Sequence, residues 1–185
     1  MLRKEMIKQS LPLLLLCGLG GIVAGSALSQ MTVLLDEIPG LIVVIPAIIA
    51  MRGNISTAFG SRLGSAYHLG VIDADNLWND ELKQSILGSI VLSFFVSLLV
   101  GVFGYLLTVL FFNVYPNFLK IVFIVLLAGL ISALILTFLT IVIIFVVFKR
   151  GYDPDNITGP ALATFGDIVT MVCIFISIIA VEVFL

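Results

Sequence analysis

The amino-acid sequence predicts an all-α integral membrane protein with five transmembrane helices. Of its 185 residues, 61% are hydrophobic and only 11% are charged, whereas about a quarter of the residues in a soluble domain are charged. A chain of this length cannot bury so much apolar surface in one core, so much of that surface has to face lipid. The apolar residues also gather in long runs separated by short polar turns, which is the pattern of successive membrane-spanning helices.

The first predicted span covers residues 10–35. Pro12 suits its first helical turn, and the glycines that follow would let another helix approach closely. The basic N-terminus is followed by an apolar run without a clear cleavage pattern. We therefore expect a retained first helix rather than a removed signal peptide. A polar turn at residues 36–40 leads into the next span.

The second predicted span, residues 40–69, is unusual. Its apolar run, residues 41–51, is short and meets Arg52, Gly53 and Asn54. The small and polar residues that follow are Ser56, Thr57, Gly60, Ser61, Gly64 and Ser65. A short apolar piece, a Gly-Asn break and a polar helix are typical of a discontinuous membrane helix that lines a cavity. The alternative is a short helix that ends in an aqueous loop, and His68 is interpreted as a loop residue.

The remaining spans are predicted at residues 85–112, 118–148 and 156–185. A polar loop at residues 71–84 precedes the third span, and a turn containing Pro116 separates the third from the fourth. The fourth span is long enough to cross the membrane with some tilt. Lys149 and Arg150 close it, and a polar turn precedes the fifth span.

The distribution of basic residues predicts the orientation. Five spans put the two ends of the chain on opposite sides, and a cytoplasmic N-terminus leaves only Lys120 on the outer side. The other eight basic residues then lie inside: Arg3, Lys4, Lys8, Arg52, Arg62, Lys83, Lys149 and Arg150. Arg52 and Arg62 are interpreted as anchors at the cytoplasmic side. We expect a multi-pass protein of the cell (plasma) membrane with an extracytoplasmic C-terminus.

Asp167 is the candidate functional residue, because it is an acid inside the fifth apolar run. A carboxylate at that depth costs about 2.5–3.5 kcal/mol on insertion scales, so we expect it to have a partner inside the membrane. We take this partner to be a divalent cation shared with the Asp167 of a second copy. A single five-span unit is small for a pore, and a two-fold homodimer is the commonest closed assembly. The alternative is a carboxylate held by a neighbouring hydroxyl or amide without an ion.

The residues around Asp167 extend this candidate site. Gly159, Ala163 and Asp167 share one helix face at a spacing of four, and Thr164 and Thr170 lie beside it. Asp153 and Asp155 would concentrate cations at the cytoplasmic mouth, although a capping turn is an equal alternative for both. Asp153 lies fourteen residues before Asp167, or roughly 21 Å along a helix.

The available ligands are carboxylates, carbonyls, hydroxyls and water, which suit Mg²⁺, with Mn²⁺ and Ca²⁺ as alternatives, and argue against Zn²⁺. The sequence contains no basic patch for nucleic acid. It also contains no nucleophile-base pair or nucleotide loop, so we expect no enzymatic activity.

Two motifs resemble a known family. The sequence IPAIIAMRGN at 45–54, continued by AFGSRL at 58–63, is similar to the second transmembrane segment of the MgtE and solute carrier family forty-one magnesium transporters. The sequences DPDN at 153–156 and ATFGD at 163–167 resemble the last segment of the same family. The resemblance covers the whole chain as one domain, residues 1–185, with no soluble regulatory domain.

The resemblance implies a homodimeric Mg²⁺ channel or transporter with its pore on the two-fold axis. Asp167 would face a hydrated Mg²⁺, Ala163 and Gly159 would line the pore below it, and Asp153 would lie at its cytoplasmic end. Asn54 would lie at the break in the second helix, beside the pore. Bacterial MgtE often has Asn in place of Gly159, and it carries cytoplasmic domains that sense Mg²⁺. We expect neither feature here, which leaves room for a separate cytoplasmic regulatory protein.

Two other functions stay open at this point. The first is a Na⁺-coupled Mg²⁺ exporter, in which the same Asp167 would alternate between the two ions. The second is a non-transporting membrane scaffold subunit, in which Asp167 is a structural hydrogen-bonding group. Besides lipid, the expected partner in either transport mechanism is a second copy of the chain.

Overall fold

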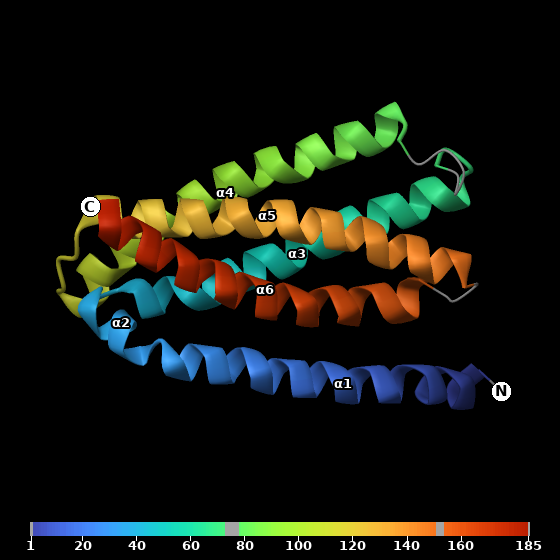
Figure 1. The fold of residues 1–185 in the computed structure, drawn as a ribbon, viewed down its shortest axis with the longest axis horizontal. Helices are drawn as coiled ribbons and strands as arrows, with labels where there is room; N and C mark the ends of the chain where they lie inside the picture. Colours follow the sequence, from blue (N-terminus) through green and yellow to red (C-terminus); the bar gives the residue numbers. More distant parts are fainter. Residues whose placement is uncertain (1, 73–77, 151–153, 185) are drawn as a thin grey trace.

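The computed structural model describes residues 2–72, 78–150 and 154–184, and these form a bundle of long helices. The helices are α1 (Leu2–Gln30), α2 (Thr32–Glu37), α3 (Leu41–His68), α4 (Asp80–Phe112), α5 (Phe118–Lys149) and α6 (Pro154–Phe184). Figure 1 shows that successive long helices run in opposite directions and that the two termini lie at opposite ends of the bundle. The short helix α2 makes the turn between α1 and α3.

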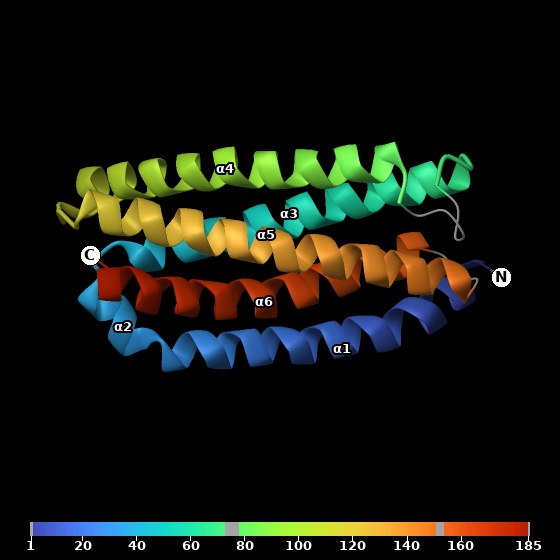
Figure 2. The same ribbon diagram turned by 45° about the horizontal axis from the view of Figure 1, so that its top comes forward.

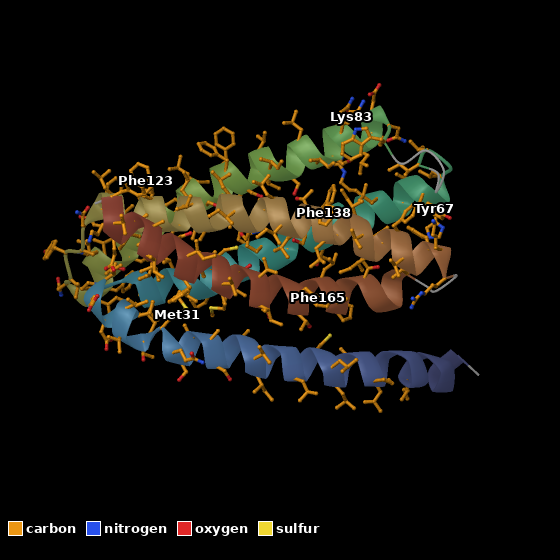
Figure 3. All side chains as sticks on the ribbon, viewed as in Figure 1. Met31, Tyr67, Lys83, Phe123, Phe138 and Phe165 are labelled. Carbon is orange, nitrogen blue, oxygen red and sulfur yellow. The ribbon has the colours of Figure 1, made fainter. Side chains whose placement is uncertain are left out.

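The arrangement has α1 at one edge and α4 at the other (Figures 1 and 2). The helix α1 packs on α6, and α4 packs on α3 and α5. The helices α3, α5 and α6 contact one another and form the centre. Figure 3 labels Phe123, Phe138 and Phe165, whose rings are exposed along the long sides of the bundle. These apolar flanks are the surface that faces lipid in a membrane protein.

The helices follow the predicted spans closely, apart from the first. The described residues hold four helices that are long and apolar enough to cross a membrane: α3, α4, α5 and residues 158–184 of α6. The apolar stretch Leu14–Gln30 of α1 is shorter than this criterion requires. The chain is therefore a multi-pass membrane protein, and the count of five spans stays a prediction.

The predicted break in the second span is wrong. The helix α3 continues without interruption from Leu41 to His68, through Gly53 and Asn54. A glycine inside a helix costs only about 1 kcal/mol relative to alanine, and the packing of α3 on three neighbouring helices outweighs that cost. For the same reason His68 is the last residue of a helix and not part of a loop.

The turns between helices form where the sequence predicts them. Gly40 has a left-handed backbone (φ 91°), and a Cβ at this position would lie 2.6 Å from Thr108 Cγ2. Asn79 caps α4 by accepting a hydrogen bond from the backbone N–H of Leu82 at 2.9 Å. Asn117 caps α5 in the same way, accepting from the backbone of Leu119 at 3.0 Å. These local contacts fix where each helix starts.

Arg52 does not lie at the cytoplasmic side, which corrects the interpretation of this residue as an interface anchor. It is 0% exposed and lies eleven residues after the start of α3, inside the bundle. Because α3 is continuous, the residue that ends the apolar run is carried into the interior and not to a membrane surface. The other basic residues still differ between the two ends of the bundle. Lys83 lies toward the end that also holds the N-terminus (Figure 3), and Lys120 lies in the first turn of α5 at the other end.

Candidate cation pathway

A polar cavity of about 280 Å³ lies between α3 and α6, toward the end of the bundle that holds the N-terminus. Its lining consists of Thr57, Gly60, Ser61, Gly64, Ser65, His68, Thr158 and Gly159. The α3 residues recur at intervals of three and four, so they share one helix face. This face is the run of small and polar residues that the sequence predicted to line a cavity.

The packing of α3 on α6 sets which residues lie at the same depth. A Cβ on Gly60 would lie 3.0 Å from Leu162 Cδ1, so these two positions meet. The two helices run in opposite directions (Figures 1 and 2). Moving six residues from Gly60 toward the start of α3 reaches Asn54, and the same step along α6 reaches Ile168, next to Asp167. Asn54 and Asp167 therefore lie at similar depth, about 9 Å beyond the Gly60 contact.

Beyond the cavity, an open strip of exposed side chains follows the same faces of the two helices. On α3, Asn54, Thr57 and Ser61 are exposed. On α6, Ala163 is exposed, whereas Asp167 is half-buried. Further along α6, Thr170 and Ile174 are buried. The strip is therefore open in the N-terminal half of α6 and closed in its C-terminal half.

Asp167 is the acid of this strip. It lies near the middle of α6, and no hydrogen bond or ion pair joins it to another residue in the described part of the chain. Among the same residues, no group of three or more His, Cys, Asp and Glu side chains could hold a metal ion. One chain therefore offers a single carboxylate in this strip. A lone carboxylate suits a cation that keeps its water shell, as Mg²⁺ does.

Two of the predicted site residues are covered by neighbouring parts of the bundle and do not border the open strip. Thr170 is fully buried in the bundle. The hydroxyl of Thr164 donates a hydrogen bond to the carbonyl of Pro160 at 3.0 Å, and its methyl group faces α1 at Gly20. The structure thus brings Asp167, Ala163, Gly159 and Asn54 to one side and leaves Thr164 and Thr170 against neighbouring helices. Asp153 and the side chain of Asp155 lie outside the part of the molecule that the structure describes.

His68 and Thr158 also line the cavity, and sequence reasoning missed both. His68 follows Gly64 by four residues, so the helical spacing could have identified it once α3 was taken as continuous. Thr158 is buried and its hydroxyl has no hydrogen-bond partner among the described residues. Thr158 therefore contributes to the wall of the cavity, with its hydroxyl oxygen buried.

Comparisons with known proteins agree with the two sequence motifs. The chain is 25% identical over 166 residues to Solute carrier family 41 member 2 of Xenopus laevis, a match that covers 85% of this chain and 29% of the relative. It is 27% identical over 172 residues to Solute carrier family 41 member 3 of Rattus norvegicus, covering 85% of this chain and 35% of the relative. The chain thus spans about a third of the length of these relatives.

A family model matches most of the same region. Residues 45–177, well over half of the chain, match the MgtE family, which is described as a divalent cation transporter. This region contains the cavity, the open strip and Asp167. The chain therefore belongs to the MgtE family of divalent cation transporters.

Proposed function

We propose that this protein carries divalent cations, with Mg²⁺ as the main substrate, across the cell membrane as a homodimer. The observation that supports it is the half-buried Asp167 in the middle of a membrane-spanning helix. This acid lies on a strip that follows the same helix faces as the polar cavity. In a single copy this carboxylate would border lipid at a cost of about 2.5–3.5 kcal/mol or more. A second copy against the same strip would remove it from lipid and bring two carboxylates to one ion.

The chemistry of the strip supports a hydrated ion. Two Asp167 carboxylates would balance the charge of one divalent cation, and the amide of Asn54 could accept from or donate to its waters at the same depth. The small side chains of Ala163 and Gly159 leave space below the acid for the water shell. Mg²⁺ dehydrates reluctantly and is usually bound with several waters retained, so such a site selects by charge and size without stripping the ion.

The orientation that goes with this proposal has the cavity at the cytoplasmic end. Lys83 marks the same end as the N-terminus, and a surplus of lysine and arginine identifies the cytoplasmic side of membrane proteins. The cavity would then be the cytoplasmic vestibule, with Asp167 deeper in the membrane. Asp153 and Asp155 precede this part of α6 in the sequence and would add negative charge near the vestibule.

The test is divalent cation flux into liposomes that contain the purified protein. Asp167→Asn keeps the size of the side chain and removes its charge, so we expect flux of Mg²⁺ to fall at least tenfold while the protein still purifies as a dimer. The matched control is Glu182→Gln, which removes an exposed carboxylate near the end of the same helix and should leave flux unchanged. Full Mg²⁺ flux through Asp167→Asn would refute the proposal.

The same experiment separates the alternative functions. Flux that requires an opposing Na⁺ gradient would indicate a Na⁺-coupled Mg²⁺ exporter in place of a channel. Wild-type protein that neither conducts nor binds Mg²⁺ would indicate the scaffold subunit. Replacing Mg²⁺ with Mn²⁺ or Ca²⁺ in the liposome assay measures the selectivity of the site.

A further inference from the structure

A second cavity lies along the seam between α1 and α6. It has a volume of about 410 Å³, and its lining consists of Val23, Ser26, Ala27, Gln30, Met31, Met171, Val172 and Phe175. Met31 and Met171 are buried and form its floor. Val23, Val172 and Phe175 are 40–57% exposed and form its rims. The cavity is therefore a crevice with a buried floor and exposed apolar edges, and we call it the α1–α6 crevice.

The α1–α6 crevice opens on a different side of α6 from the cation strip. Asp167 and Val172 are five residues apart, which places them about 140° apart around the helix. Phe165, labelled in Figure 3, is seven residues before Val172 and shares its side of α6. The ring of Phe165 is exposed and belongs to the apolar flanks that face lipid. The crevice is thus open to lipid and separate from the strip.

The depth of the crevice corresponds to one leaflet of a membrane. The helices α1 and α6 run in the same direction (Figures 1 and 2), and a Cβ on Gly20 would meet Thr164. Three residues further along each helix, Val23 is level with Asp167, near the middle of α6. From Val23 to Met31, which Figure 3 shows near the turn into α2, is roughly 12 Å of helix. Half of a hydrocarbon core of about 30 Å is a similar length.

The polarity of the lining changes along this depth. Val23 and Met171 make the deep end apolar. Gln30 is the last residue of α1, so its exposed amide lies at the end of the bundle that holds α2. Ser26 lies between them, and its hydroxyl donates to the carbonyl of Ile22 on its own helix at 2.8 Å. None of the residues that line the crevice is charged. An apolar channel with an amide donor at its outer end fits an acyl chain and the ester carbonyl that joins it to glycerol.

We propose that the α1–α6 crevice binds one acyl chain of a phospholipid from the leaflet at the α2 end, with the Gln30 amide donating to the ester carbonyl. Apolar cavities do not hold ordered water, and an empty crevice would forfeit the van der Waals contacts of its walls. The two methionines of the floor can adapt to a flexible chain, because their side chains are unbranched and polarizable. The site does not depend on the proposed transport.

The bound chain would complete the interface between α1 and α6. The helix α6 is the one long helix on which α1 packs extensively. In the half of the seam toward the N-terminus, side chains of the protein close this interface: Cys17 Sγ donates to the carbonyl of Pro160 at 3.3 Å, and Gly20 lies against Thr164. In the half toward α2, the crevice leaves the interface open, and the lipid would fill it.

The first test is fluorescence quenching by a phospholipid with bromine on its acyl chains. The sequence contains one tryptophan, Trp78, so Trp78→Phe gives a background without tryptophan. Phe175→Trp then places a probe at the rim of the crevice, and Phe138→Trp places a matched probe on the exposed flank of α5. In detergent, we expect quenching of Phe175→Trp to saturate near one lipid per chain. The lipid concentration for half of this quenching should be at least tenfold below that for Phe138→Trp.

Two results of this experiment would overturn the proposal. Equal quenching of the two probes at every lipid concentration would show that the crevice holds lipid no better than any other apolar flank. A probe at position 175 that no lipid quenches would show that protein covers the crevice, as a second copy of the chain would.

The second test is native mass spectrometry, which covers the case in which the new tryptophan itself blocks the crevice. Wild type from vesicles of phosphatidylcholine or of phosphatidylglycerol should retain one lipid per chain in both cases, because no charged residue lines the crevice. Ala27→Phe fills the crevice and should lose this lipid. Gly18→Phe adds the same ring to α1 where nothing lies within 4 Å of the added Cβ, and it should keep the lipid. No retained lipid in wild type, retention of phosphatidylglycerol alone, or equal retention in the two variants would contradict the proposal.

Discussion

Two serines one turn apart on α4 provide a sharp test of how the interior of the bundle is held. Ser93 and Ser97 are both 0% exposed, and alanine at either position removes the same single oxygen atom. Their partners differ. Ser93 Oγ accepts from the Arg52 guanidinium at 2.5 Å, whereas Ser97 Oγ donates to the sulfur of Met51 at 3.7 Å.

The expected magnitudes follow from these partners. A hydrogen bond to a charged group contributes about 1.5–3 kcal/mol, and interhelical hydrogen bonds between neutral groups in a membrane protein average about 0.6 kcal/mol. Ser93→Ala should therefore lower the free energy of unfolding by about 1.5–3 kcal/mol, because it leaves the guanidinium with no side-chain partner among the described residues. Ser97→Ala should cost about 0.6 kcal/mol or less, because a sulfur atom is a weak acceptor.

The assay is thermal unfolding of both variants in the same detergent and chloride concentration. For a chain of this length, 1 kcal/mol corresponds to about 2–4 °C, so Ser93→Ala should lower the melting temperature by about 3–12 °C and Ser97→Ala by about 2 °C or less. Ser93 Oγ also donates to the carbonyl of Ser89 on its own helix at 2.6 Å, but the contact with the charged Arg52 is the larger difference between the two serines. Equal losses in the two variants would refute the reasoning, since burial and volume are matched.

Two further predictions concern helix packing and orientation. Gly129→Ala should destabilise the protein by about 1–3 kcal/mol, measured by thermal unfolding, because the added Cβ would lie 2.8 Å from Ser97 Cβ. The control is Gly88→Ala, where nothing lies within 4 Å of the added Cβ, and it should leave stability unchanged or raise it. A cysteine in place of Lys120 should react with a membrane-impermeant maleimide added to intact cells, whereas a cysteine in place of Lys83 should react only after permeabilisation. The opposite pattern would show that the N-terminal end of the bundle lies outside the cell.

The helices could be predicted from the sequence because lipid imposes a simple requirement. Every backbone group in the apolar interior of a membrane needs a partner within its own segment, so a long apolar run is a helix. The third and fourth spans, predicted at residues 85–112 and 118–148, correspond to α4 and α5 for this reason. Asn79 and Asn117 mark the starts of these helices by capping them, which is again a local interaction.

The prediction of a break at Gly53 and Asn54 was wrong because these residues fit both a discontinuous helix and a continuous one. Glycine and asparagine weaken a helix by about 1 kcal/mol or less each, and that cost is small beside the packing of one side of α3 against three other helices. Arg52 was misplaced as a consequence, since an arginine at the end of an apolar run looks like an interface anchor. Its complete burial and its contact with Ser93 on α4 show that it belongs to the interior.

The sequence by itself determined that the protein is a helical membrane protein, that Asp167 lies near the middle of its last helix, and that small residues lead up to this acid. These properties depend on local composition and on a spacing along one helix. The tertiary structure decided which side chains near Asp167 share its environment. The helix α1 covers Thr164, and Thr170 is buried inside the bundle, so a narrow strip with Asp167, Ala163 and Asn54 stays open. The physical reason is that the elements packed on either side of a helix set which of its faces is exposed.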